Sequence, residues 1–183
     1  MTDYILYQSE FISKNQADII EDLIVARRLF IEIFGEKDTT WNYSLYNIFC
    51  LTAPATNFYQ IYSEIRSLVR RTLGETRPLW MQAWLNYHRP HEVLDWHDHL
   101  FPYHGYVSID PKRSNTVFEN YSIENKPGQI YFGPGHRKHK VEILEPYDGE
   151  RITIGFDILD TPDSLYIKYK ERPFKNMSLI PLL

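Results

Sequence analysis

The 183-residue sequence has a single cysteine, Cys50, so no internal disulfide can form. The scarcity of cysteine favours a reducing compartment. Cys50 stands between Phe49 and Leu51, and we expect it to be a small buried apolar residue rather than a nucleophile. The sequence also lacks a run of about 18–20 apolar residues that could cross a bilayer, and its start lacks the basic and apolar regions of a signal peptide. These absences predict a soluble, cytoplasmic protein.

Basic residues are fewer than acidic ones. Twenty Lys and Arg against 24 Asp and Glu give a net charge of −4, which provides no basic footprint for nucleic acid or for an anionic membrane. We therefore expect neither nucleic acid nor a membrane as a partner, and the oligomeric state is left open. The length suits a single domain over residues 1–183.

The order of local patterns predicts a mainly β, α+β fold. Residues 1–75 read as helical support, with one helix starting at a capping box over residues 13–16 and ending at Gly35, and another from about Pro54 to Leu73. From Trp80 the pattern changes to short β-favouring runs separated by turn signals. These runs are 80–88, 103–109, 115–119, 128–133, 138–144 and 150–158. We expect a jelly-roll, or cupin-like, core over 80–158 with the helices packed on one of its sheets, and a C-terminal extension over 159–183.

The run 150–158 has two distinct faces. Isoleucines and Phe156 alternate with a polar row that consists of Arg151, Thr153, Gly155 and Asp157. If helices cover the apolar row, the polar row faces the jelly-roll interior, where a small charged ligand can bind. In the run 138–144, Lys140 and Glu142 require the outer face, which places His139 inside.

The segment DWHDH, residues 95–99, concentrates side chains that can bind metals. On an extended backbone His97 and His99 share a face, and Asp95 shares it as a possible partner for an imidazole. Two such ligands and one distant histidine, His139, can hold a metal by three points and leave other positions open, as in the facial triad of non-haem Fe(II) oxygenases. His88 could line the pocket, and His104 is given no role.

The span from Trp80 to Ile158 resembles the double-stranded β-helix core of the Fe(II)/2-oxoglutarate-dependent dioxygenases, in particular small phage and bacterial proteins similar to prolyl hydroxylases. The stretches QAWLNYHRPHEVLDWHDH and NKPGQIYFGPGHRKHKVE resemble the segments that deliver the metal ligands. Those enzymes show His-x-Asp, a distal His and then Arg-x-Ser or Arg-x-Thr. Arg151 and Thr153 match the last element, twelve positions after His139.

The resemblance implies an Fe(II) site and the cosubstrates 2-oxoglutarate and O₂. It makes His97 the first ligand and His139 the distal one, and the family's aspartate position is taken by His99, with Asp98 on a bulged strand as an alternative ligand. Arg151 would pair with the distal carboxylate of 2-oxoglutarate, assisted by the Thr153 hydroxyl. Further candidates are Asn86 for the cosubstrate and Trp84, Tyr106 and Phe132 for the pocket lining.

The implied reaction is hydroxylation of an unactivated C–H bond, coupled to decarboxylation of 2-oxoglutarate to succinate. No catalytic side chain is expected beyond the metal ligands, and a peptidyl or amino-acid side chain is a plausible substrate by analogy alone. Two other functions stay open. One is a cupin-like three-histidine metalloenzyme of the thiol dioxygenase or isomerase type, and the other is a non-catalytic jelly-roll binding module.

Overall fold

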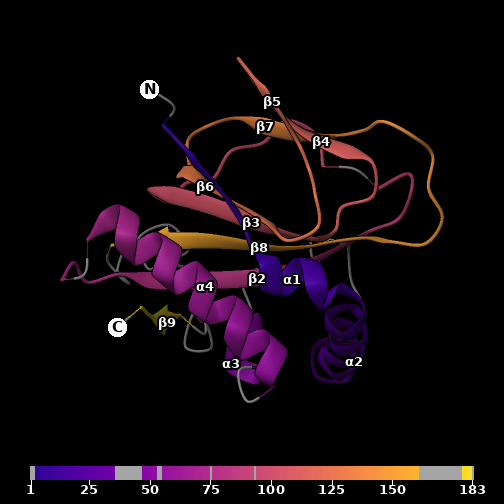
Figure 1. Cartoon of the computed structure of the whole chain (residues 1–183), viewed down its shortest axis with the longest axis horizontal. Helices are drawn as coiled ribbons and strands as arrows, with labels where there is room; N and C mark the ends of the chain where they lie inside the picture. The colour runs from indigo at the N-terminus through magenta and orange to yellow at the C-terminus, as the bar shows by residue number, and fades with distance from the viewer. Residues whose placement is uncertain are drawn as a thin grey trace.

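Two antiparallel sheets face each other, and the helices cover the outer side of the larger one (Figure 1). The computed structural model describes residues 3–35, 47–52, 55–74, 76–92, 94–160 and 179–182. The larger sheet has the strand order β1-β6-β3-β8-β2-β9 and the smaller one the order β5-β4-β7. The protein therefore has the mainly antiparallel β architecture with accessory helices that the sequence predicts.

The strands of the larger sheet come from both ends and the middle of the chain. They are β1 (Ile5–Gln8), β2 (Trp80–His88), β3 (Tyr103–Asp110), β6 (Gln129–Pro134), β8 (Arg151–Leu159) and β9 (Ile180–Pro181). The smaller sheet consists of β4 (Ser114–Phe118), β5 (Ser122–Glu124) and β7 (His139–Ile143). Six of these strands match the predicted runs to within two residues at either end. The edge strands β1 and β9 and the short β5 were not predicted.

The helices are α1 (Glu10–Lys14), α2 (Gln16–Phe34), α3 (Ile48–Thr52) and α4 (Thr56–Leu73). Gly35 and Gly74 end α2 and α4 with φ angles of 80° and 98°, which glycine adopts without steric cost. The predicted capping box at residues 13–16 is wrong. Ser9 caps α1 instead, accepting a hydrogen bond from the Ile12 N–H, and α2 begins after Asn15 without a side-chain cap.

The main hydrophobic core lies between the larger sheet and the helices. The apolar row of β8 packs there, with Ile154, Phe156 and Ile158 fully buried, together with Phe30 of α2 and Ile61 of α4. Since the helices take this row, the polar row of β8 faces the smaller sheet, as the alternation predicts. All nine residues of β8 are buried, so its polar side chains lie inside the protein.

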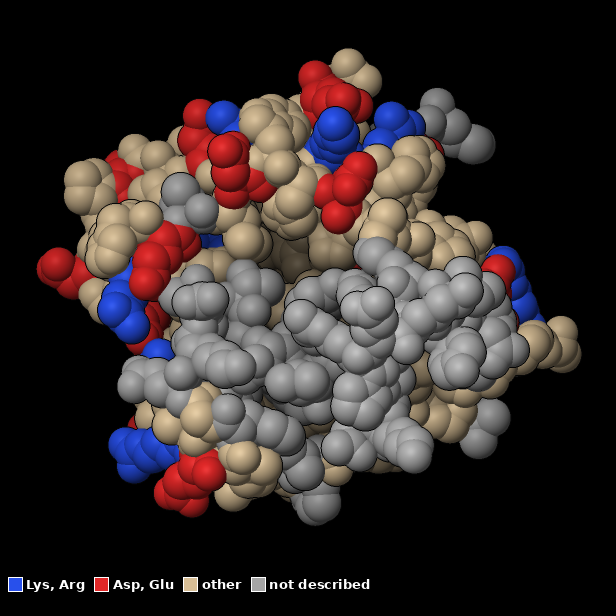
Figure 2. Space-filling model, turned by 180° about the vertical axis from the view of Figure 1, so that it is seen from behind, with Lys and Arg blue, Asp and Glu red and all other residues tan. Residues whose placement is uncertain are grey.

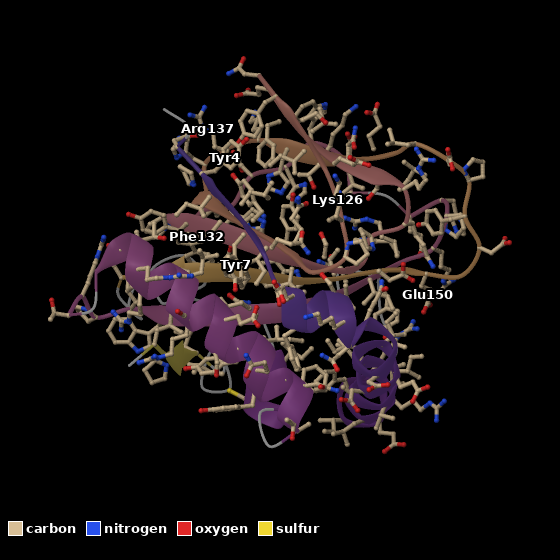
Figure 3. All side chains as sticks on the ribbon, in the orientation of Figure 1. Tyr4, Tyr7, Lys126, Phe132, Arg137 and Glu150 are labelled. Carbon is tan, nitrogen blue, oxygen red and sulfur yellow. The ribbon has the colours of Figure 1, made fainter. Side chains whose placement is uncertain are left out.

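Two residues lie elsewhere than the sequence suggests. Cys50 is exposed, because α3 turns its Ile48 and Phe49 toward the core and leaves Cys50 on the outer side. Phe132 points into the helix-side core with Phe156, not into the interior between the sheets (Figure 3). The interior position on β6 belongs to the adjacent Tyr131, which packs with Tyr106 and Phe118.

No helix in the described part of the chain combines the length and apolar character needed to cross a membrane. On the face seen in Figure 2, acidic and basic side chains are interspersed above a hollow. Most of the predicted C-terminal extension falls outside the described residues, and within it Ile180–Pro181 pairs with the start of β2.

Candidate metal centre

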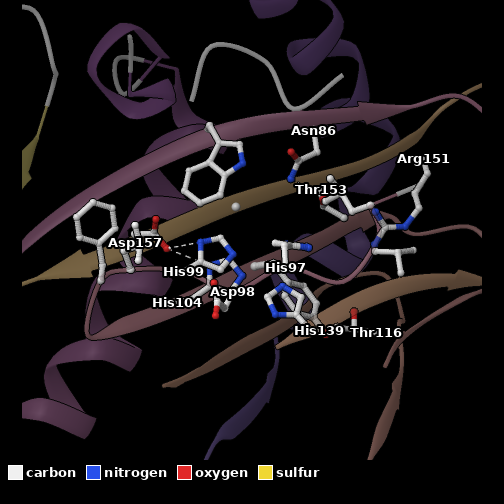
Figure 4. Close-up of a pocket in the computed structure, with 17 residues that line it drawn as sticks. Asn86, His97, Asp98, His99, His104, Thr116, His139, Arg151, Thr153 and Asp157 are labelled. Carbon is white, nitrogen blue, oxygen red and sulfur yellow. Dashed lines mark hydrogen bonds and ion pairs between the residues drawn. The ribbon is translucent and has the colours of Figure 1, made fainter. Parts of the chain in front are cut away.

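The DWHDH segment lies in the connection between β2 and β3, against the start of β7 (Figure 4). His97 and His139 pair through two main-chain hydrogen bonds of 2.9 Å, one in each direction. The His99 N–H donates to the Gly135 carbonyl at 2.8 Å. The segment is thus an irregular loop with one isolated β-bridge, and not the extended strand that we expected. Its two histidines nevertheless line the same cavity.

The side chains of His97, His99 and His139 converge. One ligand nitrogen of each lies within 4.8 Å of the other two. The ring centroids of His97 and His139 are 4.3 Å apart, and His99 lies 5.4 Å from each. Asp98 is exposed and stays outside this group, although it borders the same cavity.

In all three imidazoles, Nδ1 is the nitrogen that takes part in a hydrogen bond. Nδ1 of His97 is 2.7 Å from the Asp95 carbonyl, and Nδ1 of His139 is 3.0 Å from the Arg137 carbonyl. Nδ1 of His99 is 3.0 Å from Oδ1 of Asp157. Carbonyl and carboxylate oxygens only accept, so each Nδ1 carries a proton, and in the neutral imidazole the lone pair is then on Nε2.

This hydrogen-bond pattern suits a divalent first-row metal. Nε2 of His99 is buried and has no hydrogen-bond partner among the described residues, and such an atom is costly unless a ligand satisfies it. Three neutral imidazoles are a suitable donor set for iron, nickel, copper or zinc. The residues therefore fit a metal bound through three Nε2 atoms.

Burial keeps the histidines in the metal-binding form. Burial lowers the pKa of His97, and burial together with repulsion from His104 and His97 when these are protonated lowers the pKa of His139 to about 2. Both rings are therefore neutral at physiological pH, as metal ligation requires. The expected partner Asp95 acts through its main-chain carbonyl, because its carboxylate accepts from the Trp96 N–H.

His104 and Asp157 form a second layer behind His99. They lie opposite each other on β3 and β8, and His104 Nδ1 is 3.1 Å from the same Asp157 oxygen that His99 contacts. The His99 and His104 rings stack with centroids 3.5 Å apart and planes 11° apart. Burial opposes ionisation of Asp157, but His99 and His104, through their hydrogen bonds and the positive charge that they carry when protonated, lower its pKa to about 2.

Sequence reasoning placed Asp157 in the inward row and gave it no role, and it missed His104. The alternation of side chains along the run 103–109 could have indicated that His104 faces the cavity. His104 and Tyr106 share a face of β3, and both border the cavity.

A buried cation lies away from the histidines in the same cavity (Figure 4). Arg151 is 3% exposed, its Nε donates to Ser114 Oγ at 3.2 Å, and its Nη1 lies 3.4 Å from His88 Nδ1. No carboxylate among the described residues is within ion-pair distance of it. Burial lowers its pKa to about 10, which leaves it charged at neutral pH.

Thr153 and Asn86 lie beside Arg151, facing each other across β8 and β2. The Asn86 side-chain amide donates to Thr153 Oγ1 at 3.1 Å, so the Thr153 hydroxyl hydrogen is free to donate into the cavity. Asn86 Oδ1 is buried without a hydrogen-bond partner in the described part of the chain. The arrangement offers hydrogen-bond donors to an anion beside a fixed positive charge.

The cavity has a volume of about 210 Å³ and joins the two groups. Trp84 and Tyr106 line it, whereas Phe132 and His88 do not. The Trp84 ring crosses Gly155, where a Cβ atom would lie 2.6 Å from the indole. The absence of a side chain at Gly155 therefore makes room for the indole next to His99.

Comparisons with known proteins show the fold. No family model matches the sequence, and no curated protein matches it. Among solved structures, the non-haem α-ketoglutarate-dependent carbocyclase SnoK from nogalamycin biosynthesis aligns over 91% of this chain and 86% of its own, with a TM-score of 0.60 and 11% identity. The non-haem monooxygenase ThoJ, in complex with nickel, aligns over 86% and 73%, with a TM-score of 0.56 and 11% identity.

A third structure is the epimerase SnoN from the same biosynthesis, in complex with Fe³⁺, α-ketoglutarate and nogalamycin RO. It aligns over 86% of this chain and 79% of its own, with a TM-score of 0.54 and 12% identity. The chain thus has the jelly-roll fold of the Fe(II)/2-oxoglutarate oxygenases.

Proposed function

We propose that this protein is a non-haem Fe(II)- and 2-oxoglutarate-dependent oxygenase that hydroxylates an unactivated C–H bond of a substrate still to be found. The observation that carries the proposal is the combination of groups in one cavity. A three-histidine cluster with Nε2 atoms available and a buried arginine without a carboxylate partner among the described residues share the same 210 Å³ space. Neither feature stabilises the fold by itself, and a metal chelated by a dicarboxylate satisfies both.

His97, His99 and His139 would hold Fe(II) through their Nε2 atoms. Three protein ligands leave coordination positions for the 2-oxoacid end of 2-oxoglutarate and for O₂. When bound, iron with these two cosubstrates supplies the oxidising power to break a C–H bond, while 2-oxoglutarate leaves as succinate and CO₂. The protein orients the reactants and excludes water.

Arg151 would bind the distal carboxylate of 2-oxoglutarate. A guanidinium pairs with a carboxylate through two parallel hydrogen bonds, and in a buried site the ionic pairing compensates for the cost of keeping the cation out of water. The Thr153 hydroxyl, oriented by the Asn86 amide, would donate a further hydrogen bond. Ser114 and His88 already fix the guanidinium before the cosubstrate arrives.

The structural neighbours support the cofactor chemistry more than the outcome of the reaction. SnoK and SnoN are named as α-ketoglutarate-dependent or bound to it, and one acts as a carbocyclase and the other as an epimerase. ThoJ is named as a monooxygenase. Hydroxylation is the outcome that the proposal selects, because it would need no protein group beyond those proposed to hold the metal and 2-oxoglutarate.

The test compares two 2-oxoacids under anaerobic conditions. The Fe(II)-loaded protein is titrated with 2-oxoglutarate and with 2-oxobutyrate, which keeps the chelating end but lacks the distal carboxylate, and the visible charge-transfer band is recorded. The proposal expects a band with 2-oxoglutarate at much lower concentration than with 2-oxobutyrate. Arg151→Met should remove this preference, and the control Arg113→Met, at an exposed ion pair with Glu145, should keep it.

Three results would contradict the proposal. Iron binding without any response to 2-oxoglutarate would favour a three-histidine metalloenzyme of the thiol dioxygenase or isomerase type, which the histidine cluster alone also suits. A charge-transfer band that appears at the same concentration of both 2-oxoacids would show that Arg151 does not bind the distal carboxylate. Failure to bind any divalent metal would leave a non-catalytic binding module.

A further inference from the structure

We propose that Asp157 is the positioning residue of the metal centre and that it supplies, through His99, the negative charge that a carboxylate ligand supplies in a two-histidine, one-carboxylate site. The inference rests on the proposed function only in requiring a metal at the three histidines. It concerns the aspartate of the inward row of β8, which the resemblance to known oxygenases leaves without a role.

The contact between Asp157 and His99 is direct and enclosed. Asp157 is 1% exposed, and its Oδ1 lies 3.0 Å from His99 Nδ1. This hydrogen bond fixes which nitrogen of His99 carries the proton and turns the unpartnered Nε2 toward His97 and His139. A carboxylate behind a ligating imidazole also increases the electron density at the metal-binding nitrogen.

His104 holds the carboxylate and the ring from the other side. Its Nδ1 donates to the same Oδ1 of Asp157 at 3.1 Å, and its ring stacks on His99. His99, His104 and Asp157 could themselves be mistaken for a second metal site, since their donor atoms lie within 4.8 Å of one another. The nitrogens that face the carboxylate already hydrogen-bond to it, so His104 and Asp157 support His99 instead of forming a second metal site with it.

The strand register prevents Asp157 from becoming a ligand itself. Asp157 lies in the middle of the larger sheet, opposite Gln82 on one side and His104 on the other. The loop that carries His99 is attached to the turn before β7 by the His99–Gly135 hydrogen bond. The carboxylate is therefore held one hydrogen bond away from His99 Nδ1, and the His99 imidazole would separate it from a metal bound at Nε2.

The formal charge of the site agrees with a carboxylate that lies behind a ligand instead of binding the metal itself. A divalent metal with two histidines and one carboxylate has one net positive charge. The same metal with three neutral histidines has two, and the Asp157 carboxylate behind His99 returns the total to one. His99 stands where the resembled family has an aspartate ligand. The buried Asp157 behind it restores the net charge that this ligand would give.

The first experiment measures metal affinity without turnover. Wild type, Asp157→Asn and a control variant are titrated anaerobically with cobalt(II), a spectroscopic stand-in for Fe(II). The control, Asp110→Asn, removes a carboxylate of β3 that pairs with Lys112 in the connection after that strand. Asp157→Asn should weaken cobalt binding by about 10–100-fold and shift the visible ligand-field bands. Asp110→Asn should match wild type. Unchanged affinity and spectrum in Asp157→Asn would overturn the proposal.

A pair of variants tests whether Asp157 acts through His99. His99→Asp keeps a potential ligand at position 99 but removes the imidazole that Asp157 contacts. The loss of cobalt(II) affinity that Asp157→Asn causes in the wild type should therefore become smaller in the His99→Asp background, and a double-mutant cycle measures this coupling. An equal loss in both backgrounds would show that Asp157 does not act through His99.

A measurement on the wild type covers the case in which the variants do not fold. Long-range ¹H–¹⁵N spectra of the zinc-loaded protein report which imidazole nitrogen is protonated. The proposal expects a protonated Nδ1 and a metal-bound Nε2 on His99, and metal bound through Nδ1 would contradict it. Wild type that binds metal but not 2-oxoglutarate would overturn the proposed function alone, whereas an unaffected Asp157→Asn would overturn this inference alone.

Discussion

The main chains of His97 and His139 are joined by two reciprocal hydrogen bonds of 2.9 Å, although 42 positions separate them in the sequence. This single bridge connects the loop before β3 to the first residue of β7 and sets the two imidazoles with centroids 4.3 Å apart. Because the contact is between backbones, it persists when a side chain is replaced. Ligand substitutions can therefore be interpreted as losses of a ligand rather than of the fold.

His139→Ala should abolish tight metal binding and leave the protein folded. Alanine keeps the N–H and C=O that pair with His97, and only the imidazole is lost. Anaerobic Fe(II) titration should show a fall in affinity of more than about 100-fold, above the range typical for loss of a hydrogen-bond partner of a ligand, with an unchanged circular dichroism spectrum. The exposed His136 provides the control, since His136→Ala should bind like wild type. Similar losses in both variants would contradict the ligand assignment.

Arg151→Met should make the metal-free protein more stable. Burial lowers the pKa of Arg151 from 12.5 to about 10, so the fold disfavours the charged form by about 3 kcal/mol. A linear apolar side chain avoids that cost, although Ser114 loses a hydrogen-bond partner. Urea unfolding should show a gain of about 1–3 kcal/mol, with no gain in the exposed-site control Arg113→Met. Loss of stability in Arg151→Met would mean that the guanidinium is structural.

The metal-free protein should lose stability as the pH falls from 6.5 toward 4. Burial, reinforced by neighbouring positive charge, lowers the pKa of both His88 and His104 from 6.5 to about 4. The unfolded chain therefore binds protons first on acidification, and the stability present above pH 6.5 declines below it, by up to about 3 kcal/mol for each group. Urea unfolding at pH 7.5 and 5 measures the loss. His88→Gln should reduce it, His136→Asn should not, and a flat profile would contradict the prediction.

Gly155→Ala should destabilise the protein, and Trp84→Phe should relieve the effect. A Cβ at position 155 lies 2.6 Å from Cε2 and Cζ2 and 2.9 Å from Nε1 of Trp84, and the shorter phenyl ring does not extend as far. Overpacking of this kind costs about 1–3 kcal/mol. A double-mutant cycle by thermal unfolding should give a favourable coupling between the two substitutions. Purely additive effects would mean that the indole simply rotates away.

The order of elements and the faces of β8 could be read from the sequence because they depend on local periodicity. Alternating residues of a strand must point to opposite sides, so the polar row of β8 and the inward position of His139 follow from the residues themselves. The same reasoning failed for Phe132. The run 128–133 contains Ile130, Tyr131 and Phe132 in succession, and an apolar sequence without contrast does not indicate which face meets the helices.

The pairings between distant segments were decided by the tertiary structure. Nothing near His104 in the sequence points to Asp157, and only the register of β3 against β8 brings them together behind His99. The edge strands β1 and β9 likewise exist because β6 and β2 present free hydrogen-bonding groups to them. The sequence alone determined which residue types were present for metal and anion chemistry. Their convergence in one cavity depended on long-range strand pairing, which local periodicity does not specify.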